Sequence, residues 1–293
     1  MSTGEQLPIL LVFDRNYWAP AYTVMRSICA HSRRLPDLIF HLAYLDLEPW
    51  QIADLEKIRE EFGVTLVFHD LSANDRFSAI QAQLKTNERF GVFVYARMLI
   101  HEFVGPGPRR AVYLDCDIMV RAPIENLWDL DMGGNPIAAV SDVGGWVFTA
   151  GRELRENPSN LALSDGYFNS GVLLIDLELW RREEVWSQFN QIVQSGQLQN
   201  MYFDQDVLNL IFRRRWASLE WRWNVLDPSE QLAPTNPYIL HYTGFKKPWL
   251  LRSKVGFARL YRHTMTNELF YRYFRFRMSG KLRRLLPWMR ARK

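Results

Sequence analysis

Residues 7–32 read "LPILLVFDRNYWAPAYTVMRSICAHS", an apolar run that ends in a polar turn and continues into apolar residues at helical spacing. This pattern predicts a buried strand followed by a helix packed on one face. Residues 38–45 and 64–70 predict two further strands, and residues 49–62 predict a helix with a proline in its first turn. Strands that alternate with helices favour right-handed crossovers and a parallel sheet with helices on both faces. The sequence therefore predicts an α/β fold.

The rest of the chain continues this pattern less regularly. Residues 72–91 have mixed polarity and predict a loop with at most one helical turn, and residues 143–165 predict a long, glycine-rich loop. Further strands are expected at residues 112–120, 135–142, 168–180 and 237–244, the third of them running into a helix. Helices are expected at residues 94–103 and 203–212 and over the last thirty or so residues. Several of these strands end in polar residues, at the edge where open parallel sheets bind ligands.

The composition fits one large α/β domain, or a domain with an appendage. The chain has 293 residues, of which 48% are hydrophobic and 23% charged. Two cysteines predict reduced, packed thiols and no disulfide framework. The sequence has no signal-peptide pattern and no long apolar window, so we expect a cytoplasmic protein. It contains neither G-x-G-x-x-G nor a P-loop, which disfavours a dehydrogenase or a P-loop enzyme.

Positive charge is concentrated at the C-terminal end. Residues 270–293 hold nine Lys or Arg and no acid, whereas the rest of the chain holds 27 basic residues against 32 acidic ones. We expect an α/β domain at residues 1–255 and a basic, aromatic helical region at residues 256–293. Aromatic and aliphatic residues interleaved with these charges favour an anchor on an anionic membrane over a solvated, disordered tail. No nucleic-acid-binding module is recognisable, so a nucleic-acid partner is not expected.

The segment "VYLDCDIMV" at residues 112–120 places two carboxylates inside an apolar run. In one continuous strand Asp115 and Asp117 share a face, and Cys116 points the other way. Two such carboxylates suppress each other's ionisation unless a cation lies between them, and oxygen ligands suit Mg²⁺ or Mn²⁺. The alternative is a strand end with two solvated carboxylates.

Three further motifs have the polarity of a nucleotide site, and each has a plainer alternative. Asp14 and Asn16 in "FDRNY" suit a base edge and ribose hydroxyls, or simply begin the next helix. Arg97 in "VYARMLI" suits a diphosphate, or is a solvated surface arginine. Asn169 in "YFNSGV" precedes two small residues that let a backbone approach a ligand, or that form a tight turn.

Two motifs in the second half of the chain complete the set. In "FDQDVLN" the polar residues Asp204 and Gln205 begin a helix, where acids complement the helix dipole and a second role is open. "HYTGFKKPW" combines His241, Gly244 and Lys247 near a strand end, which suits a metal diphosphate, although a lone histidine is more often structural. Together these motifs supply the groups that a metal-bound nucleotide diphosphate requires.

In this number and order, the motifs resemble those of family 8 glycosyltransferases, particularly bacterial lipopolysaccharide α-galactosyl- and α-glucosyltransferases. The resemblance runs from about Ile9 to Trp249 and rests on "FDRNY", "VYAR", "VYLDCDIMV", "YFNSGVLLIDLELWR", "DQDVLN" and "HYTGFKKPW". It implies a GT-A fold, in which a mostly parallel sheet flanked by helices joins a nucleotide-binding unit to an acceptor-binding half. It also implies a UDP-sugar donor, Mn²⁺ (with Mg²⁺ possible) as the metal, and retention of anomeric configuration.

The resemblance also implies roles by position. The expected metal ligands are Asp115, Asp117 and His241. The expected contacts of the uridine are Asp14, Asn16 and Tyr17. The diphosphate is expected beside Lys247, the backbone of Gly244, and Arg97. The transferred sugar is expected among Asp142, Asn169, Asp204 and Gln205. Of these residues, the catalytic ones are expected to be Arg97, Asp204 and Gln205, the last beneath the anomeric carbon.

The expected reaction is transfer of galactose or glucose from UDP to lipopolysaccharide, capsule or another glycolipid, on the cytoplasmic face of a membrane. The loops at residues 72–91 and 143–165 are expected to close over the donor, and Trp146 and Phe148 could stack on a sugar or pack within their loop. One alternative is a starch- or glycogen-priming transferase with a protein or glucan acceptor. Another is a catalytically inactive nucleotide-sugar-binding scaffold.

Overall fold

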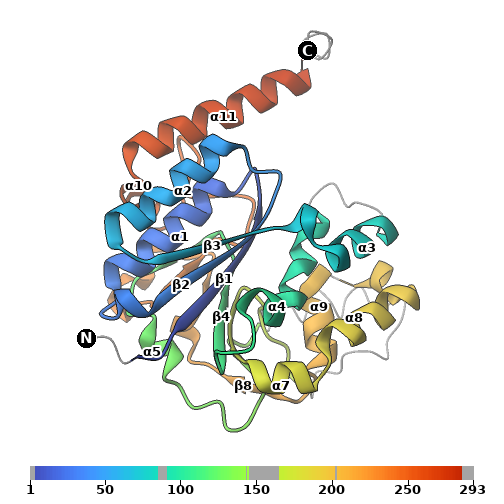
Figure 1. Cartoon of the computed structure of the whole chain (residues 1–293). Helices are drawn as coiled ribbons and strands as arrows, with labels where there is room; N and C mark the ends of the chain where they lie inside the picture. The colour runs from blue at the N-terminus through green and yellow to red at the C-terminus, as the bar shows by residue number, and fades with distance from the viewer. Residues whose placement is uncertain (1–3, 85–90, 143, 145–164, 202, 286–293) are drawn as a thin grey trace.

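A seven-stranded sheet runs through the centre of the molecule, with helices on both sides (Figure 1). The computed structural model describes residues 4–84, 91–142, 144, 165–201 and 203–285. The strand order is β3-β2-β1-β4-β7-β6-β8. Its strands are β1 (Leu7–Asp14), β2 (Leu38–Leu45), β3 (Thr65–Asp70), β4 (Arg110–Leu114), β6 (Ile137–Ala139), β7 (Val172–Asp176) and β8 (Trp216–Ser218).

The sheet is mostly parallel, as expected. β1 runs parallel to both β2 and β4, β2 runs parallel to β3, and β6 runs parallel to β8. Only β7 is antiparallel to its two neighbours, β4 and β6. Because β7 is reversed, its first residues lie at the same edge as the last residues of β4, which is where the candidate site forms.

The first seventy residues fold as the sequence predicts. Helix α1 (Trp18–His31) follows β1, and helix α2 (Pro49–Phe62) follows β2. A capping box between Glu48 and Gln51 begins α2, and Gly63, at φ 70°, ends it in the left-handed conformation that favours glycine. Alternate residues of β1 face two separate cores: Ile9 packs on the side of α1, and Leu10 packs on the side of α4 (Ile100–Val104).

The predicted single strand at residues 112–120 is wrong. The chain leaves the large sheet after β4, turns at residues 115–117, and enters a second sheet as β5 (Ile118–Val120). This three-stranded sheet has the order β5-β10-β9, with β9 at Val225–Leu226 and β10 at Ile239–His241. Residues 111–114 of β4 and all of β5 are apolar and buried, so the hydrophobic pattern carries no sign of the break between the two strands.

The loop predicted at residues 72–91 is also wrong in part. Helix α3 (Asp75–Gln83) occupies its first half, and the side chain of Asn74 caps α3 by accepting a hydrogen bond from the backbone N–H of Phe77. The helix expected at residues 94–103 is a 3₁₀ helix over Val92–Leu99 that continues into α4. Residues 85–90 lie outside the described residues.

The elements predicted in the second half of the chain appear in the predicted order. The helices of this half are α5 (Glu125–Trp128), α7 (Leu177–Arg182), α8 (Val185–Gln194), α9 (Phe203–Ile211), α10 (Ala258–Met265) and α11 (Asn267–Leu285). Of the elements that the structure shows here, α5, α8, β8 and β9 are not predicted from the sequence. Tyr261 of α10 and Tyr273 of α11 are buried in the same core as α1, and the Tyr273 hydroxyl donates to the carbonyl of Asn16 at 2.6 Å. The far end of α11 projects past the body (Figure 1). In the described part of the chain, we find no helix long and apolar enough to cross a membrane.

Candidate active site

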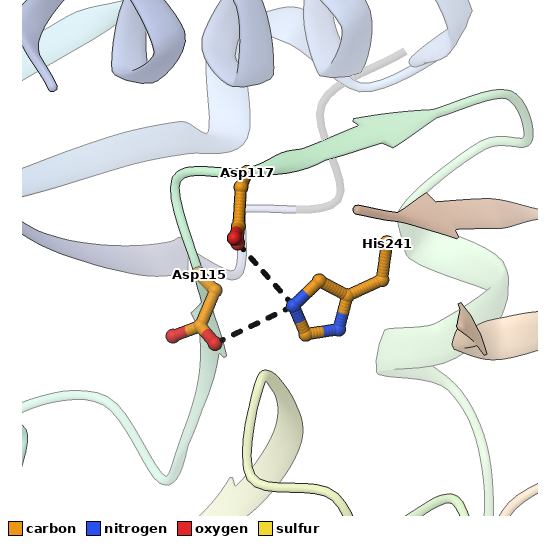
Figure 2. A group of neighbouring side chains, drawn as sticks. All are labelled: Asp115, Asp117 and His241. Carbon is orange, nitrogen blue, oxygen red and sulfur yellow. Dashed lines mark ion pairs between the residues drawn. The ribbon is translucent and has the colours of Figure 1, made fainter. Parts of the chain in front are cut away.

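Asp115, Asp117 and His241 come together between the two sheets (Figure 2). The Nε2 atom of His241 lies 3.6 Å from Oδ2 of Asp115 and 3.3 Å from Oδ1 of Asp117. One ligand atom from each of the three residues fits within 4.8 Å of the others. The histidine is buried, and the two carboxylates are half-buried.

Backbone hydrogen bonds hold these segments together. The N–H of Asp115 donates to the carbonyl of Gly171 at 2.8 Å, which ties the turn at residues 115–117 to the start of β7. The N–H of Tyr242 donates to the carbonyl of Asp117 at 2.9 Å, and β10 pairs with β5 so that His241 lies opposite Ile118. The carboxylates therefore converge because the chain turns between two sheets, and not because they alternate along one strand.

Each carboxylate points one oxygen toward His241. Its other oxygen accepts hydrogen bonds from a neighbouring cation or hydroxyl group. Oδ1 of Asp115 accepts from Arg97 at 2.8 Å and from the Tyr113 hydroxyl at 2.7 Å. Oδ2 of Asp117 accepts from Lys247 at 2.7 Å. Burial by itself raises the pKa of Asp117, but His241 and Lys247 outweigh it and hold this pKa below its ordinary value.

The donor set fits a divalent cation. Two carboxylate oxygens and one imidazole nitrogen point into the same space, and their charges and donor types suit Mn²⁺ and Mg²⁺. The carboxylate oxygens that face away from His241 accept hydrogen bonds from Arg97, Tyr113 and Lys247. Hydrogen bonds of this kind orient the carboxylates that bind a metal.

Arg97 lies at the middle of the site, so the alternative of a surface arginine is wrong. Its side chain is buried, donates a hydrogen bond to Asp115 at 2.8 Å, and forms an ion pair with Asp204 at 2.7 Å. It also donates to the carbonyl of Ser170 at 3.1 Å and lies over the ring of Tyr113, 4.1 Å from the centroid. Burial opposes the charge of Arg97, but Asp204 and Asp115 outweigh it and raise its pKa above the ordinary value.

A second cluster surrounds the side chain of Gln205. Its Oε1 accepts from Asn169 at 3.1 Å and from the backbone N–H of Ser170 at 3.2 Å. Its Nε2 donates to Asp142 at 3.3 Å and to the Tyr167 hydroxyl at 3.1 Å. Both ends of the amide are therefore fixed. Asp204, the preceding residue, joins this cluster to the first one through Arg97.

The "FDRNY" motif at the end of β1 is held by hydrogen bonds between its own residues. The backbone N–H of Asn16 donates to Oδ1 of Asp14 at 2.9 Å, and its side-chain amide donates to Oδ2 at 2.7 Å. No side chain caps the start of α1, so these residues do not serve as its cap. Burial raises the pKa of Asp14, although the bonds from Asn16 act against it. Tyr17 meets Trp249 edge to face, with ring centroids 5.6 Å apart, which places this motif beside the "KKPW" motif.

Several residues of the site are not among those predicted from the sequence. Tyr113 and Ser170 hold Asp115 and Arg97, and Asp227 accepts from the backbone N–H of Gly244 at 2.8 Å. Asn224 lies 2.9 Å from the ring of His241. Tyr113 and Ser170 lie inside two of the sequence motifs but have no predicted role there, whereas Asp227 and Asn224 stand in no recognisable motif and reach the site only through the tertiary fold. The predicted sugar-stacking residues Trp146 and Phe148 lie outside the described residues.

Gly171 leaves no room for a side chain. A Cβ atom at this position would lie 2.7 Å from Oδ2 of Asp115 and closer still to the ring of His241. We expect Gly171→Ala to displace one of these two side chains and, if the cluster holds a divalent cation, to weaken Mn²⁺ binding at least tenfold. Titration of the purified protein with Mn²⁺ measures the effect. Gly107→Ala is the matched control because a Cβ atom there meets nothing within 4 Å, and equal affinities for the two variants would contradict the prediction.

The sheet and the acidic cluster at its edge agree with a glycosyltransferase of the GT-A fold. A solved structure titled as the galactosyltransferase LgtC in complex with donor and acceptor sugar analogues superposes with a TM-score of 0.72. The likeness covers 88% of this chain and 95% of that one, at 23% sequence identity, and shows the fold. The family model described as glycosyl transferase family 8 matches residues 8–252. The chain therefore belongs to glycosyl transferase family 8.

The chain is also similar to other bacterial proteins. It is 30% identical to general stress protein A of Bacillus subtilis, over 91% of this chain and 95% of that protein. It is 24% identical to the lipopolysaccharide 1,2-glucosyltransferase of Escherichia coli, over 85% of this chain and 74% of the enzyme. It spans between 28% and 59% of the length of the streptococcal glycosyltransferases that it also matches.

Proposed function

We propose that the protein transfers a galactose or glucose unit from a UDP-sugar to a glycan acceptor with retention of configuration. The observation that carries this proposal is the single network that joins Asp115, Asp117 and His241 to Gln205 through Arg97 and Asp204. The similarity to a lipopolysaccharide glucosyltransferase supports a hexose as the transferred unit, and lipopolysaccharide or another glycolipid as the acceptor.

In this proposal, Asp115, Asp117 and His241 hold the metal. A bound Mn²⁺, or Mg²⁺ in its place, supplies positive charge beside the diphosphate leaving group. Lys247 adds a second positive charge at the same edge, because its ammonium group already lies against Asp117. These charges are fixed before the reaction, which is the arrangement that stabilises a leaving group most effectively.

The remaining motif residues bind the donor in this proposal. Asp14, Asn16 and Tyr17 contact the uridine, and the backbone of Gly244 approaches the diphosphate. The transferred hexose lies among the side chains that surround Gln205, namely Asp142, Asn169 and Asp204. Carboxylate and amide groups of this kind can donate to and accept from the hydroxyls of a sugar.

The geometry favours attack from the face on which UDP leaves. An amide is a poor nucleophile, and the Oε1 of Gln205 already accepts two hydrogen bonds. The carboxylate of Asp204 is paired with Arg97 and accepts from Ser170. In the proposed step, the acceptor hydroxyl forms the new C–O bond as the bond to the UDP oxygen breaks, and a phosphate oxygen takes the hydroxyl proton. A sugar found covalently attached to Asp204 by mass spectrometry would contradict this step, since enzymes with a carboxylate nucleophile form such an intermediate.

A panel of nucleotide sugars tests the donor. The protein is incubated with Mn²⁺ and UDP-galactose, UDP-glucose or GDP-mannose without acceptor, and release of the nucleotide diphosphate is followed. We expect slow release of UDP from one UDP-hexose, its loss on addition of a chelator, and no release from GDP-mannose. Binding of UDP-hexose without any release would favour the inactive scaffold, and transfer to the protein itself would favour the priming type of transferase.

We also propose that the basic C-terminal region binds an anionic membrane on its cytoplasmic face. Tyr271 and Met278 are exposed on α11, beside the exposed cation of Arg275. Leu269 and Tyr273, in contrast, are buried in the core, so the test removes only residues 281–293, which carry six Lys or Arg. Each such charge contributes about 1 kcal/mol at an anionic surface, so flotation with phosphatidylglycerol vesicles should be lost. Unchanged flotation, or equal binding to neutral vesicles, would contradict the anchor.

A further inference from the structure

Asn224 connects the metal-binding cluster to the cluster around Gln205. It lies between the short 3₁₀ helix at Trp221–Trp223 and strand β9, and the residue is 2% exposed. Its Oδ1 is 2.9 Å from Nδ1 of His241, and its Nδ2 donates to Oδ1 of Asn169 at 2.8 Å. Asn169 in turn donates to Gln205.

Groups that can only donate or only accept a hydrogen bond fix the orientation of the side-chain amides of Asn169 and Asn224. The backbone N–H of Gly171 can only donate, and it donates to Oδ1 of Asn169 at 3.0 Å. The carboxylate of Asp142 accepts from Nδ2 of Asn169 at 3.3 Å. Asn169 therefore presents its oxygen to Asn224, and Asn224 must present its NH₂ group to Asn169.

The same reasoning assigns the proton on the imidazole. Since the NH₂ group of Asn224 faces Asn169, its oxygen faces His241, and an oxygen acceptor requires a hydrogen on Nδ1. In the neutral ring the lone pair is then on Nε2, the nitrogen that faces Asp115 and Asp117. A hydrogen bond to the far nitrogen is how proteins prepare a histidine for a metal.

We propose that Asn224 is a positioning residue that holds His241 as the metal-binding tautomer and ties its ring to Asn169. This inference rests on the proposed function in one respect, namely that the cluster of Asp115, Asp117 and His241 binds a divalent cation. Asn224 itself contacts neither metal nor sugar. It acts through His241 on one side and through Asn169 on the other.

Two substitutions separate these contacts. Asn224→Leu is similar in size and removes both hydrogen bonds. Asn224→Asp keeps an oxygen that accepts from Nδ1 of His241 but cannot donate to Asn169. We expect the leucine variant to bind Mn²⁺ about 10- to 100-fold more weakly than the wild type. We expect the aspartate variant to keep most of its Mn²⁺ affinity and to lose turnover, because Asn169 and Gln205 are no longer held.

The affinity is read from the electron paramagnetic resonance signal of free Mn²⁺ in the absence of donor. The tautomer is read without any metal, from long-range ¹H–¹⁵N spectra of the ¹⁵N-histidine-labelled apoprotein at alkaline pH, where imidazoles are neutral. The signal of His241 is assigned by its absence in His241→Gln. We expect the Nδ1–H tautomer in the wild type and in Asn224→Asp, and a mixture of tautomers in Asn224→Leu.

Val225→Ala is the matched control, because Val225 is the next residue, is also buried, and has an apolar side chain. We expect it to keep the wild-type tautomer and Mn²⁺ affinity. The inference is overturned if Asn224→Leu binds Mn²⁺ as the wild type does and keeps the same tautomer, or if Val225→Ala weakens binding equally. Failure of the wild type to bind Mn²⁺ would instead contradict the proposed function, and the tautomer spectra would still test Asn224.

Discussion

Asp117→Asn is expected to lower the rate of UDP release by about a thousandfold or more. The substitution keeps the shape of the side chain but removes one of the two negative charges that face His241. It also removes the carboxylate that pairs with Lys247. A metal stabilises the charge of a leaving group by several kcal/mol, and each ~1.4 kcal/mol corresponds to a tenfold change in rate.

The measurement is UDP release with Mn²⁺ and the preferred UDP-hexose, together with Mn²⁺ affinity in the absence of donor. Asp129→Asn is the matched control, because Asp129 is an exposed carboxylate outside the cluster. We expect the control to keep both properties. Turnover by Asp117→Asn in the presence of a chelator, at the wild-type rate, would show that the Asp–Asp–His cluster is not required.

Arg97→Met is expected to lower the free energy of unfolding by about 3–5 kcal/mol and to abolish transfer. The guanidinium group of Arg97 is buried and pairs with both Asp115 and Asp204. Removing one partner of a buried ion pair leaves an uncompensated buried charge, which is strongly destabilising. Asp204 is affected most, because burial already raises its pKa and Arg97 is the main group that opposes this.

Urea denaturation of the two proteins measures the difference. The control is Arg109→Met, since the side chain of Arg109 is 74% exposed and lies 3.7 Å from Asp176. An exposed pair of this kind contributes about 1 kcal/mol at most. Adding Asp204→Asn to Arg97→Met should restore part of the lost stability, because it removes the unpaired charge. Equal urea midpoints for Arg97→Met and Arg109→Met would contradict a structural role for Arg97.

The carboxylate pair shows how a local prediction can succeed for the wrong reason. A strand over residues 112–120 would also have placed Asp115 and Asp117 on one face, but the chain turns between them and enters a different sheet. The apolar residues on either side are equally buried in both sheets, so hydrophobicity cannot mark the turn. The break is set by backbone bonds to Gly171 and Tyr242, which are distant in sequence.

For Arg97, in contrast, the sequence leaves two environments open, and only the fold decides between them. Its residue type allows both a solvated head and a buried charge, and its neighbours in the chain do not distinguish them. Arg97 is buried because the tertiary fold places Ser170, 73 positions away, and Asp204, at the start of α9, against its side chain. Asn224 is similar, because the residue that it meets, Asn169, is 55 positions away and no local pattern marks either contact.

The sequence by itself determined the alternation of strands and helices, the parallel first half of the sheet, and the residues whose chemistry suits a metal diphosphate. These properties follow from apolar periodicity and capping, which depend on neighbours within a few positions. Only the tertiary structure decided that Asp115, Asp117 and His241 converge, that Arg97 is buried between them and Asp204, and that Asn224 meets the imidazole of His241. These contacts join segments from different parts of the chain, so they depend on how the two sheets pack and not on any local propensity.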